Sequence, residues 1–221
     1  LKKEMKNAAR AQEYEKAARL RDQTEGLENI FAHRMLLEKP FHPRHRGPDA
    51  NWTEIQRIIK QTLEISSPIS RVEGYDISNI SGESATGSMI VFVNGRPDSS
   101  QYRMFRIKTV RGANDVAMHK EVIRRRLNHP EWPYPDLMVI DGGQPQLNAV
   151  RDVIAKIPLV ALAKREEELY IPGHSKSTRL RSLPHGTEMF FRHVRDESHR
   201  FAKKYHHKLR ELTYRNAHNH E

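Results

Sequence analysis

The chain has 221 residues, of which 37% are hydrophobic and 30% charged, and it contains no cysteine. This length suits one ordinary domain with an appendage, and the composition argues against a disordered chain. No apolar run reaches the roughly eighteen residues of a membrane-spanning helix, which argues against a membrane span. Without cysteine, thiolate zinc sites and cysteine nucleophiles are excluded, so any metal must bind carboxylate or imidazole groups. We expect a globular, cytoplasmic protein without a membrane partner.

The excess positive charge lies in two short segments. The net charge is +10, from 38 Lys and Arg against 28 Asp and Glu. Residues 103–126 carry eight basic and two acidic residues, and residues 188–210 carry seven and three, so these segments hold the whole excess. Such concentration favours a polyanion as partner, because neutralised phosphates release counterions. The alternatives are a solvated basic face without function and, less favoured, an anionic membrane surface.

The first residues of the chain predict a helical hairpin. Residues 1–36 are rich in Ala, Lys, Glu, Arg and Leu, with one glycine and no proline, which gives high helix propensity. Apolar faces at Leu1–Ala9 and Tyr14–Arg21 are separated by a polar interval that can hold the turn of an antiparallel pair. Helices this short need a partner, either the rest of the chain or another protein's helices. Residues 37–51 contain three prolines and one glycine, and they are predicted to form a linker.

Residues 52–210 predict one α/β domain. Apolar residues recur at helical spacing from Trp52 to Leu63, and beyond residue 70 the pattern becomes that of strands. The expected elements are strands 71–77, 86–93 and 102–107, helix 115–128, strand 136–141, helix 144–157, strand 159–163, a hairpin of 168–171 and 179–183, and helix 188–210. This is the order of the ribonuclease H-like fold, an antiparallel meander continued by parallel crossovers. We expect an RNase H-like mixed five-stranded sheet with flanking helices, and a C-terminal tail at 211–221.

Two aspartates lie where a sheet could hold a cation. Asp76 is inside a strand, where aspartate has poor β-propensity and, if buried, must be paired or bind a cation. Asp141 ends an apolar strand before two glycines, at the carboxyl edge where open sheets place ligand sites. If the two strands are neighbours, the carboxylates converge, and an oxygen-seeking divalent cation relieves their repulsion. The alternatives are a turn or cap aspartate at Asp141 and a solvent-facing residue at Asp76.

Other candidates carry weaker signals. Asp115 opens the helix 115–128, where a capping aspartate needs no catalytic explanation. His199 shares a stripe of the last helix with charged residues, although a histidine there is more often a surface residue. His119 follows Asp115 by one turn, a spacing that resembles a metal pair without having to be one.

Phosphodiester hydrolysis would give these residues a joint role. The reaction needs an activated water, neutralised charge in the transition state and help for the leaving 3′ oxygen. Mg²⁺ or Mn²⁺ on Asp76 and Asp141 would act as the Lewis acid, with an imidazole as base or additional ligand. Basic residues of the two charged segments would hold the phosphates, which predicts recognition of the backbone rather than of sequence.

Six stretches between residues 70 and 210 resemble the C-terminal half of the UvrC family, a component of the excinuclease of bacterial nucleotide excision repair. In the family's order they are Gly74–Gly82, Tyr102–Ile107, Asn114–Met118, Val139–Leu147, Ala163–Glu167 and Arg195–Ala202. The N-terminal hairpin is similar to the family's UVR motif at Tyr14–Asp22. The changes from the family's pattern, at Asn79, at Ser198 and at Gln144–Pro145, spare every proposed ligand.

The resemblance implies a divalent-metal-dependent endonuclease that cuts on the 5′ side of a lesion in double-stranded DNA within the UvrABC system. It places the catalytic and metal-binding residues at Asp76, Asp115, Asp141 and His199, with Mg²⁺ or Mn²⁺ as the ion. It implies that the hairpin binds UvrB through Tyr14, Glu15, Ala17, Ala18 and Arg21. From the basic stretches we expect DNA contacts at Arg103, Arg106, Lys108, Arg111, Lys164, Arg200 and Lys203.

Two other functions stay open. The 221 residues do not include the family's module for the 3′ cut or its helix-hairpin-helix pair, which motivates a non-cutting module that binds DNA and docks on UvrB. A ribonuclease or transposase-like enzyme on the same fold is the more remote alternative, because a fold alone does not determine function.

Overall fold

The computed structural model divides the chain into two compact units, Leu1–Arg46 and Gly47–Glu221. It describes residues 13, 50–78, 85–110, 112, 114–154, 156–163 and 167–218, with side chains up to Lys203. The predicted hairpin, apart from Glu13, and most of the predicted linker lie outside the described residues. The fold below is that of the second unit.

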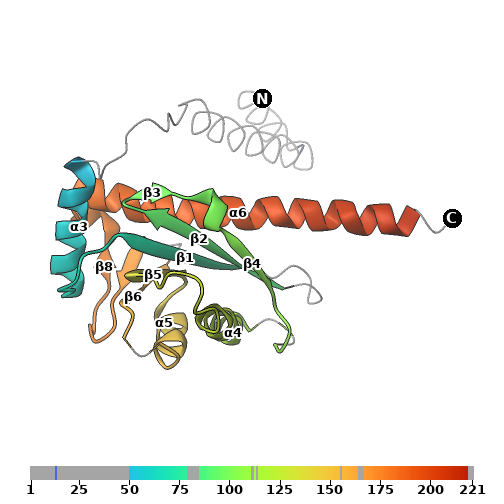
Figure 1. Cartoon of the computed structure of the whole chain (residues 1–221), viewed down its shortest axis with the longest axis horizontal. Helices are drawn as coiled ribbons and strands as arrows, with labels where there is room; N and C mark the ends of the chain where they lie inside the picture. Colours follow the sequence, from blue (N-terminus) through green and yellow to red (C-terminus); the bar gives the residue numbers. More distant parts are fainter. Residues whose placement is uncertain are drawn as a thin grey trace. The chain divides into compact units, whose positions relative to one another are not determined.

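A mixed sheet of eight strands forms the centre of this unit (Figure 1). The strands are β1 (Arg71–Ser78), β2 (Thr86–Val93), β3 (Arg96–Pro97), β4 (Arg103–Arg106), β5 (Leu137–Asp141), β6 (Leu159–Ala163), β7 (Glu168–Tyr170) and β8 (Thr178–Arg179). Their order is β3-β2-β1-β5-β6-β7-β8, with β4 also paired to β2. The β1–β5 and β5–β6 pairs are parallel and the other pairs antiparallel.

The expected mixed α/β class is confirmed, but the sheet is wider than the five strands predicted. The predicted hairpin, now β7 and β8, adds to the edge of β6 instead of standing apart. The two residues of β3 pair with β2 after the tight turn at Asn94 and Gly95, both of which have positive φ. Two-residue strands leave too short a pattern for alternation to reveal.

Helices cover both faces of the sheet. Helix α6 (His185–His218) lies on one face, and α4 (Asp115–Leu127) and α5 (Gln144–Arg151) lie on the other (Figure 1). Helix α3 (Ala50–Leu63) packs against α6. With both faces covered, β5 and β6 are apolar and almost fully buried, as expected of parallel strands. None of the described helices is long and apolar enough to cross a membrane.

Two helices differ in length from the prediction. Helix α6 extends to His218, so residues 211–218, predicted as tail, are helical; this stretch has no glycine or proline to end a helix. Helix α5 ends at Arg151 instead of 157, where the Val153 N–H bonds to the Val150 carbonyl three residues back, a 3₁₀-type turn.

The side chains of β1 alternate between the two helical layers. Glu73 meets Arg126 of α4, whereas a Cβ added to Gly74 would lie only 2.8 Å from the Ser198 Oγ of α6. Because successive residues of a strand face opposite sides, Asp76 shares the α6 face with Gly74. The face of each residue in β1 therefore decides which helix it can meet.

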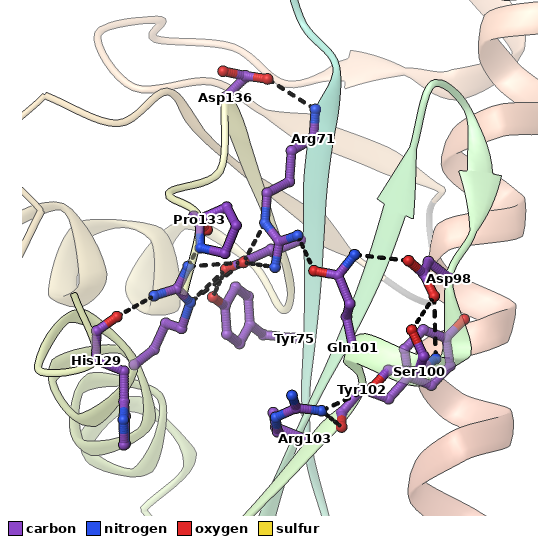
Figure 2. Close-up of polar contacts among 12 residues, drawn as sticks. Arg71, Tyr75, Asp98, Ser100, Gln101, Tyr102, Arg103, His129, Pro133 and Asp136 are labelled. Carbon is purple, nitrogen blue, oxygen red and sulfur yellow. Dashed lines mark hydrogen bonds and ion pairs between the residues drawn. The ribbon is translucent and has the colours of Figure 1, made fainter. Parts of the chain in front are cut away.

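A buried ion network fastens α4 to the opposite face. Glu73 and Arg126 are both fully buried, and the Arg126 Nε and Nη2 lie 3.0 Å from the two Glu73 carboxylate oxygens. Arg71 and the Tyr75 hydroxyl also donate to Glu73, while Arg126 donates to the carbonyls of His129 and Pro133 (Figure 2). Burial, together with the neighbouring Glu73, raises the pKa of Tyr75 well above its usual value. These hydrogen bonds offset the cost of taking both charges out of water.

Candidate metal centre

Three ligand-bearing residues meet at one edge of the sheet. Asp76 comes from β1, Asp141 ends β5, and His199 comes from α6. One ligand atom from each lies within 4.8 Å of those from the other two. Strands β1 and β5 are parallel neighbours, with Tyr75 opposite Ile140, so their carboxyl ends reach the same edge. The structure thus brings together three of the four residues that the resemblance implies.

The geometry of this centre suits a hard divalent cation. Asp76 is only 4% exposed, and its Oδ2 lies 3.1 Å from the His199 Nδ1. Asp141 and His199 are partly exposed, so the centre is open to an ion and a substrate. Two carboxylates and one imidazole form a donor set that suits Mg²⁺ or Mn²⁺. The contact with Asp76 also fixes the orientation of the imidazole ring.

The turn after Asp141 excludes a helix-cap role for this residue. Helix α5 is capped by Gly143, whose N–H donates to the Gln146 Oε1 at 3.0 Å. Gly142 has φ +150° and would place a Cβ 2.8 Å from the Gln146 side chain, which favours glycine there. Asp141 is therefore not the cap of α5, and its carboxylate stands at the strand end instead.

Close packing and a side-chain network hold α6 at the level that brings His199 to Asp76. The Cβ that an alanine at position 74 would carry lies 2.9 Å from the Val194 Cγ1 as well as close to Ser198. Sequence reasoning did not identify this contact, although a glycine inside a strand is the signal for a close approach. Two residues before His199, the carboxylate of Glu197 accepts a hydrogen bond of 2.8 Å from Tyr102, which fastens α6 to the start of β4.

The Glu197 network shifts the pKa of both partners. Burial raises the pKa of Tyr102, and the adjacent Glu197 carboxylate raises it further. Burial opposes ionisation of Glu197, but hydrogen bonds from Arg200 and Tyr102 hold its pKa below the usual value. Arg200, one of the predicted DNA contacts, is thereby engaged by two bonds to Glu197 of 2.6 Å each.

Asp115 stands apart from the three-residue group. It is the exposed first residue of α4, and the cap is the preceding Asn114, which accepts from the Ala117 N–H. One turn later, His119 is 2% exposed, with its Nδ1 2.9 Å from the Asp115 carbonyl oxygen and its Nε2 buried without a hydrogen-bond partner. Burial lowers the pKa of His119, opposed by the Asp115 carbonyl and the carboxylate of Asp76.

The predicted DNA contacts on β4 fall on different faces of the sheet. Tyr102, which reaches α6, marks the face of Asp76, and alternation places Arg106 on that face. The register Ser78–Thr86–Arg106 puts Arg106 two strands from β1, about 10 Å away. Arg103 lies on the opposite face.

The remaining predicted contacts are spread along the chain. Lys108 is exposed just beyond β4, and its backbone N–H donates to Glu121. Lys203 is exposed on α6 one turn after His199. Arg111 and Lys164 lie outside the described residues, as do the five predicted UvrB contacts. Both basic segments are predicted to flank the carboxylates. The structure places Arg106 and α6 on the face of Asp76, whereas Arg126 of α4 is buried against Glu73 on the far face.

Comparisons with known proteins agree with the resemblance. The model of the UvrC RNAse H endonuclease domain matches residues 60–202, and the UvrB/uvrC motif matches residues 1–30. A UvrABC system protein C of Dehalococcoides mccartyi is 41% identical over 208 residues, 88% of this chain and 34% of that protein. Its counterpart in Methanothermobacter thermautotrophicus is 44% identical over 157 residues, 69% of this chain and 26% of that protein.

The chain spans about a third of the length of the first of these relatives. Among solved structures, a Ciona intestinalis endonuclease V in complex with DNA has a TM-score of 0.38 at 16% identity, covering 57% of this chain and 62% of that one. That likeness is too weak to add to the assignment. The family model covers more than half of the residues, including all three members of the candidate metal centre. The chain belongs to the UvrC RNAse H endonuclease domain family.

Proposed function

We propose that this chain is a divalent-metal-dependent DNA endonuclease that makes the 5′ incision beside a lesion in double-stranded DNA, as part of the cytoplasmic UvrABC system. The observation that carries the proposal is the convergence of Asp76, Asp141 and His199 at the carboxyl ends of β1 and β5. The family model and the named relatives support the same reaction class. Asp115 is proposed as a further acidic group of the site on the resemblance alone.

The residues of the centre divide the chemistry between them. Asp76, Asp141 and His199 would hold Mg²⁺ or Mn²⁺, which supplies a Lewis acid for the charge that develops on the attacked phosphate. Asp76 orients the His199 ring through Nδ1, an arrangement in which an imidazole can take a proton from the attacking water.

Basic residues near the centre would hold the DNA backbone. Arg106 and Lys203 are the best placed, because Arg106 shares the face of Asp76 and Lys203 follows His199 on α6. Arg200 follows His199 on α6, and Lys108, Arg111 and Lys164 complete the set proposed for this side. Arg103 would meet DNA on the opposite face of the sheet. Such contacts neutralise phosphates without reading bases, so they suit an enzyme that cuts beside lesions in any sequence.

We propose that the N-terminal hairpin docks on UvrB. The match of the UvrB/uvrC motif to residues 1–30 supports this partner. The proposed contacts are Tyr14, Glu15, Ala17, Ala18 and Arg21, and a short helical pair of this kind gains stability by packing against partner helices.

A nicking assay with matched variants tests the function. A duplex with one bulky lesion is incubated with the UvrA and UvrB proteins, Mg²⁺ and this chain, and the 5′ incision is measured. Asp76→Asn and Asp141→Asn should each lower the incision rate about a hundredfold or more. Asp152→Asn is the control, because Asp152 is 72% exposed and its ion pair with Lys120 is long at 4.0 Å. It removes the same charge away from the centre.

The same assay separates the alternatives. Incision that survives both aspartate variants would contradict the proposed centre. A native chain that binds DNA and UvrB but leaves the duplex intact would be the non-cutting module. Faster cutting of an RNA–DNA hybrid than of damaged duplex would indicate a ribonuclease on the same fold.

A further inference from the structure

A cluster of aromatic rings and cations lies beside β4, on the face of the sheet opposite the metal centre. We call it the Trp132 cluster. Its members are Arg103, Phe105, Arg125, Arg126, His129, Trp132 and Tyr134. Within the described part of the chain, β4 pairs with β2 alone, so the cluster borders an edge strand.

The rings of this cluster form layers that reach the surface. The His129 ring is stacked on Trp132, with centroids 4.0 Å apart and an angle of 6° between planes. The Arg103 and Arg126 guanidinium groups lie 5.2 and 5.5 Å from the Trp132 ring, and Arg126 also lies 5.7 Å from Tyr134. The outer layers remain open to solvent, because the His129 side chain is 42% exposed and Tyr134 is 53% exposed.

Internal packing accounts for only part of the cluster. Trp132 lies against the buried Arg126, and Phe105 packs on Trp132, which is an ordinary structural role. That role does not account for the exposure of Tyr134, which contacts Arg126 and still leaves half of its side chain open: among the described residues, only it and Met189 are large hydrophobic side chains with high exposure. A surface ring next to arginines can still gain energy from a stacked ligand.

The charge around the cluster favours an anionic ligand. Among the described residues, Arg103 donates only to the backbone carbonyls of Ser100 and Tyr102, and Arg124 is exposed next to Arg125 in the sequence segment with the largest positive excess. Three acidic residues pair with other members of the cluster: Glu73 with Arg126, Glu121 with Arg125 at 3.3 Å, and Glu131 with the His129 Nδ1 at 2.6 Å. Of the cations in the cluster, Arg103 therefore remains for an anionic ligand. Flat rings with cations beside them suit a nucleotide better than an acidic peptide, since bases offer faces for stacking and phosphates meet the cations.

We propose that the Trp132 cluster binds unpaired nucleotides of the DNA substrate, with bases stacked on His129 and Tyr134 and phosphates near Arg103. Unpaired bases are required because a duplex keeps its base faces covered. Arg103 and Arg106 are three residues apart on β4, about 10 Å, and face opposite sides of the sheet. A single strand that passes over the edge of β4 therefore meets the cluster on one side and the face of the metal centre on the other. The proposal rests on the proposed function, because it takes the anionic ligand of the cluster to be DNA.

Tryptophan fluorescence tests the proposal directly. The chain has two tryptophans, of which Trp52 is 2% exposed, so a ligand from solvent acts mainly on Trp132. An oligodeoxythymidine of about 12 nucleotides is titrated into the full chain in EDTA, where the metal centre plays no part. We expect quenching, with an affinity that Tyr134→Ala lowers about fivefold to a hundredfold. Met189→Ala is the control and should leave the affinity unchanged, because Met189 on α6 is similarly exposed, at 49%.

Other outcomes would overturn the proposal without touching the metal centre. Equal affinity in Tyr134→Ala and Met189→Ala would show that no base stacks there. Equal quenching by a blunt duplex of the same length would indicate a plain electrostatic patch. Asp76→Asn should keep the native affinity for the oligonucleotide while it loses incision, so failure of the cluster and failure of the proposed function give different results.

Discussion

Alanine at position 74 should disturb the metal centre from a distance. Its Cβ would lie 2.8 Å from the Ser198 Oγ and 2.9 Å from both the Ile90 Cγ1 and the Val194 Cγ1. Ordinary contacts begin near 3.5 Å, so α6 must retreat by roughly 0.7 Å or its side chains must leave their rotamers. Overpacking of this kind costs about 2 kcal/mol, which lowers the urea midpoint by about 1 M. The same retreat would stretch the 3.1 Å contact between His199 and Asp76.

Two measurements on Gly74→Ala check this reasoning. Urea unfolding followed by circular dichroism gives the loss of stability, and Mn²⁺ titration followed by electron paramagnetic resonance gives the affinity of the centre. Gly143→Ala is the matched control, because its Cβ would meet only Pro145 at an ordinary 3.8 Å. Adding Val194→Ala to Gly74→Ala should restore part of the stability, since it removes one clashing atom. Native stability and native Mn²⁺ affinity in Gly74→Ala would refute the argument.

Three further predictions concern buried polar groups. Arg126→Met should lower the free energy of unfolding by about 3–5 kcal/mol in urea, because Glu73 stays buried without its main partner; a loss below about 1 kcal/mol would contradict this. Burial opposes ionisation of Glu121, but hydrogen bonds from Thr109 hold the pKa of this carboxyl below its usual value. The ionised Glu121 therefore contributes its full stabilisation above about pH 5, and this contribution is lost as the pH falls through the lowered pKa. Thermal melts from about pH 6 to 3 should therefore fall less steeply in Glu121→Gln, and parallel curves would count against the assignment. His119→Met should keep or raise the stability in urea, because the His119 Nε2 is buried without a hydrogen-bond partner among the described residues. A clear loss of stability would show that this nitrogen does have a hydrogen-bond partner.

The parts of the fold with long, regular patterns were predictable. Strands β2 and β6 have the predicted bounds, because each is a mainly apolar run between turn or loop residues. The convergence of Asp76 and Asp141 also followed from local reasoning, since parallel neighbouring strands bring their carboxyl ends together. Resemblance to a known family added His199 and Asp115, which spacing alone could not select.

Contacts between distant segments were not predictable from the pattern. His199 reaches Asp76 because α6 packs over Gly74, and that packing depends on shapes 120 residues apart in the chain. The basic segment 103–126 looked uniform in sequence, yet the alternation of β4 and the position of α4 distribute its charges over two faces. Short strands such as β3 were missed because two residues carry no period.

The three members of the metal centre come from strands and a helix spread over more than half of the chain. Asp76 and His199 are 123 residues apart in sequence, so no local fragment carries the donor set. An ion that needs all three groups would bind the folded chain and ignore the unfolded one. By mass action, free ion at about 100 times its dissociation constant would then add about 2.7 kcal/mol to stability. The ion would therefore stabilise the folded domain in addition to taking part in the reaction.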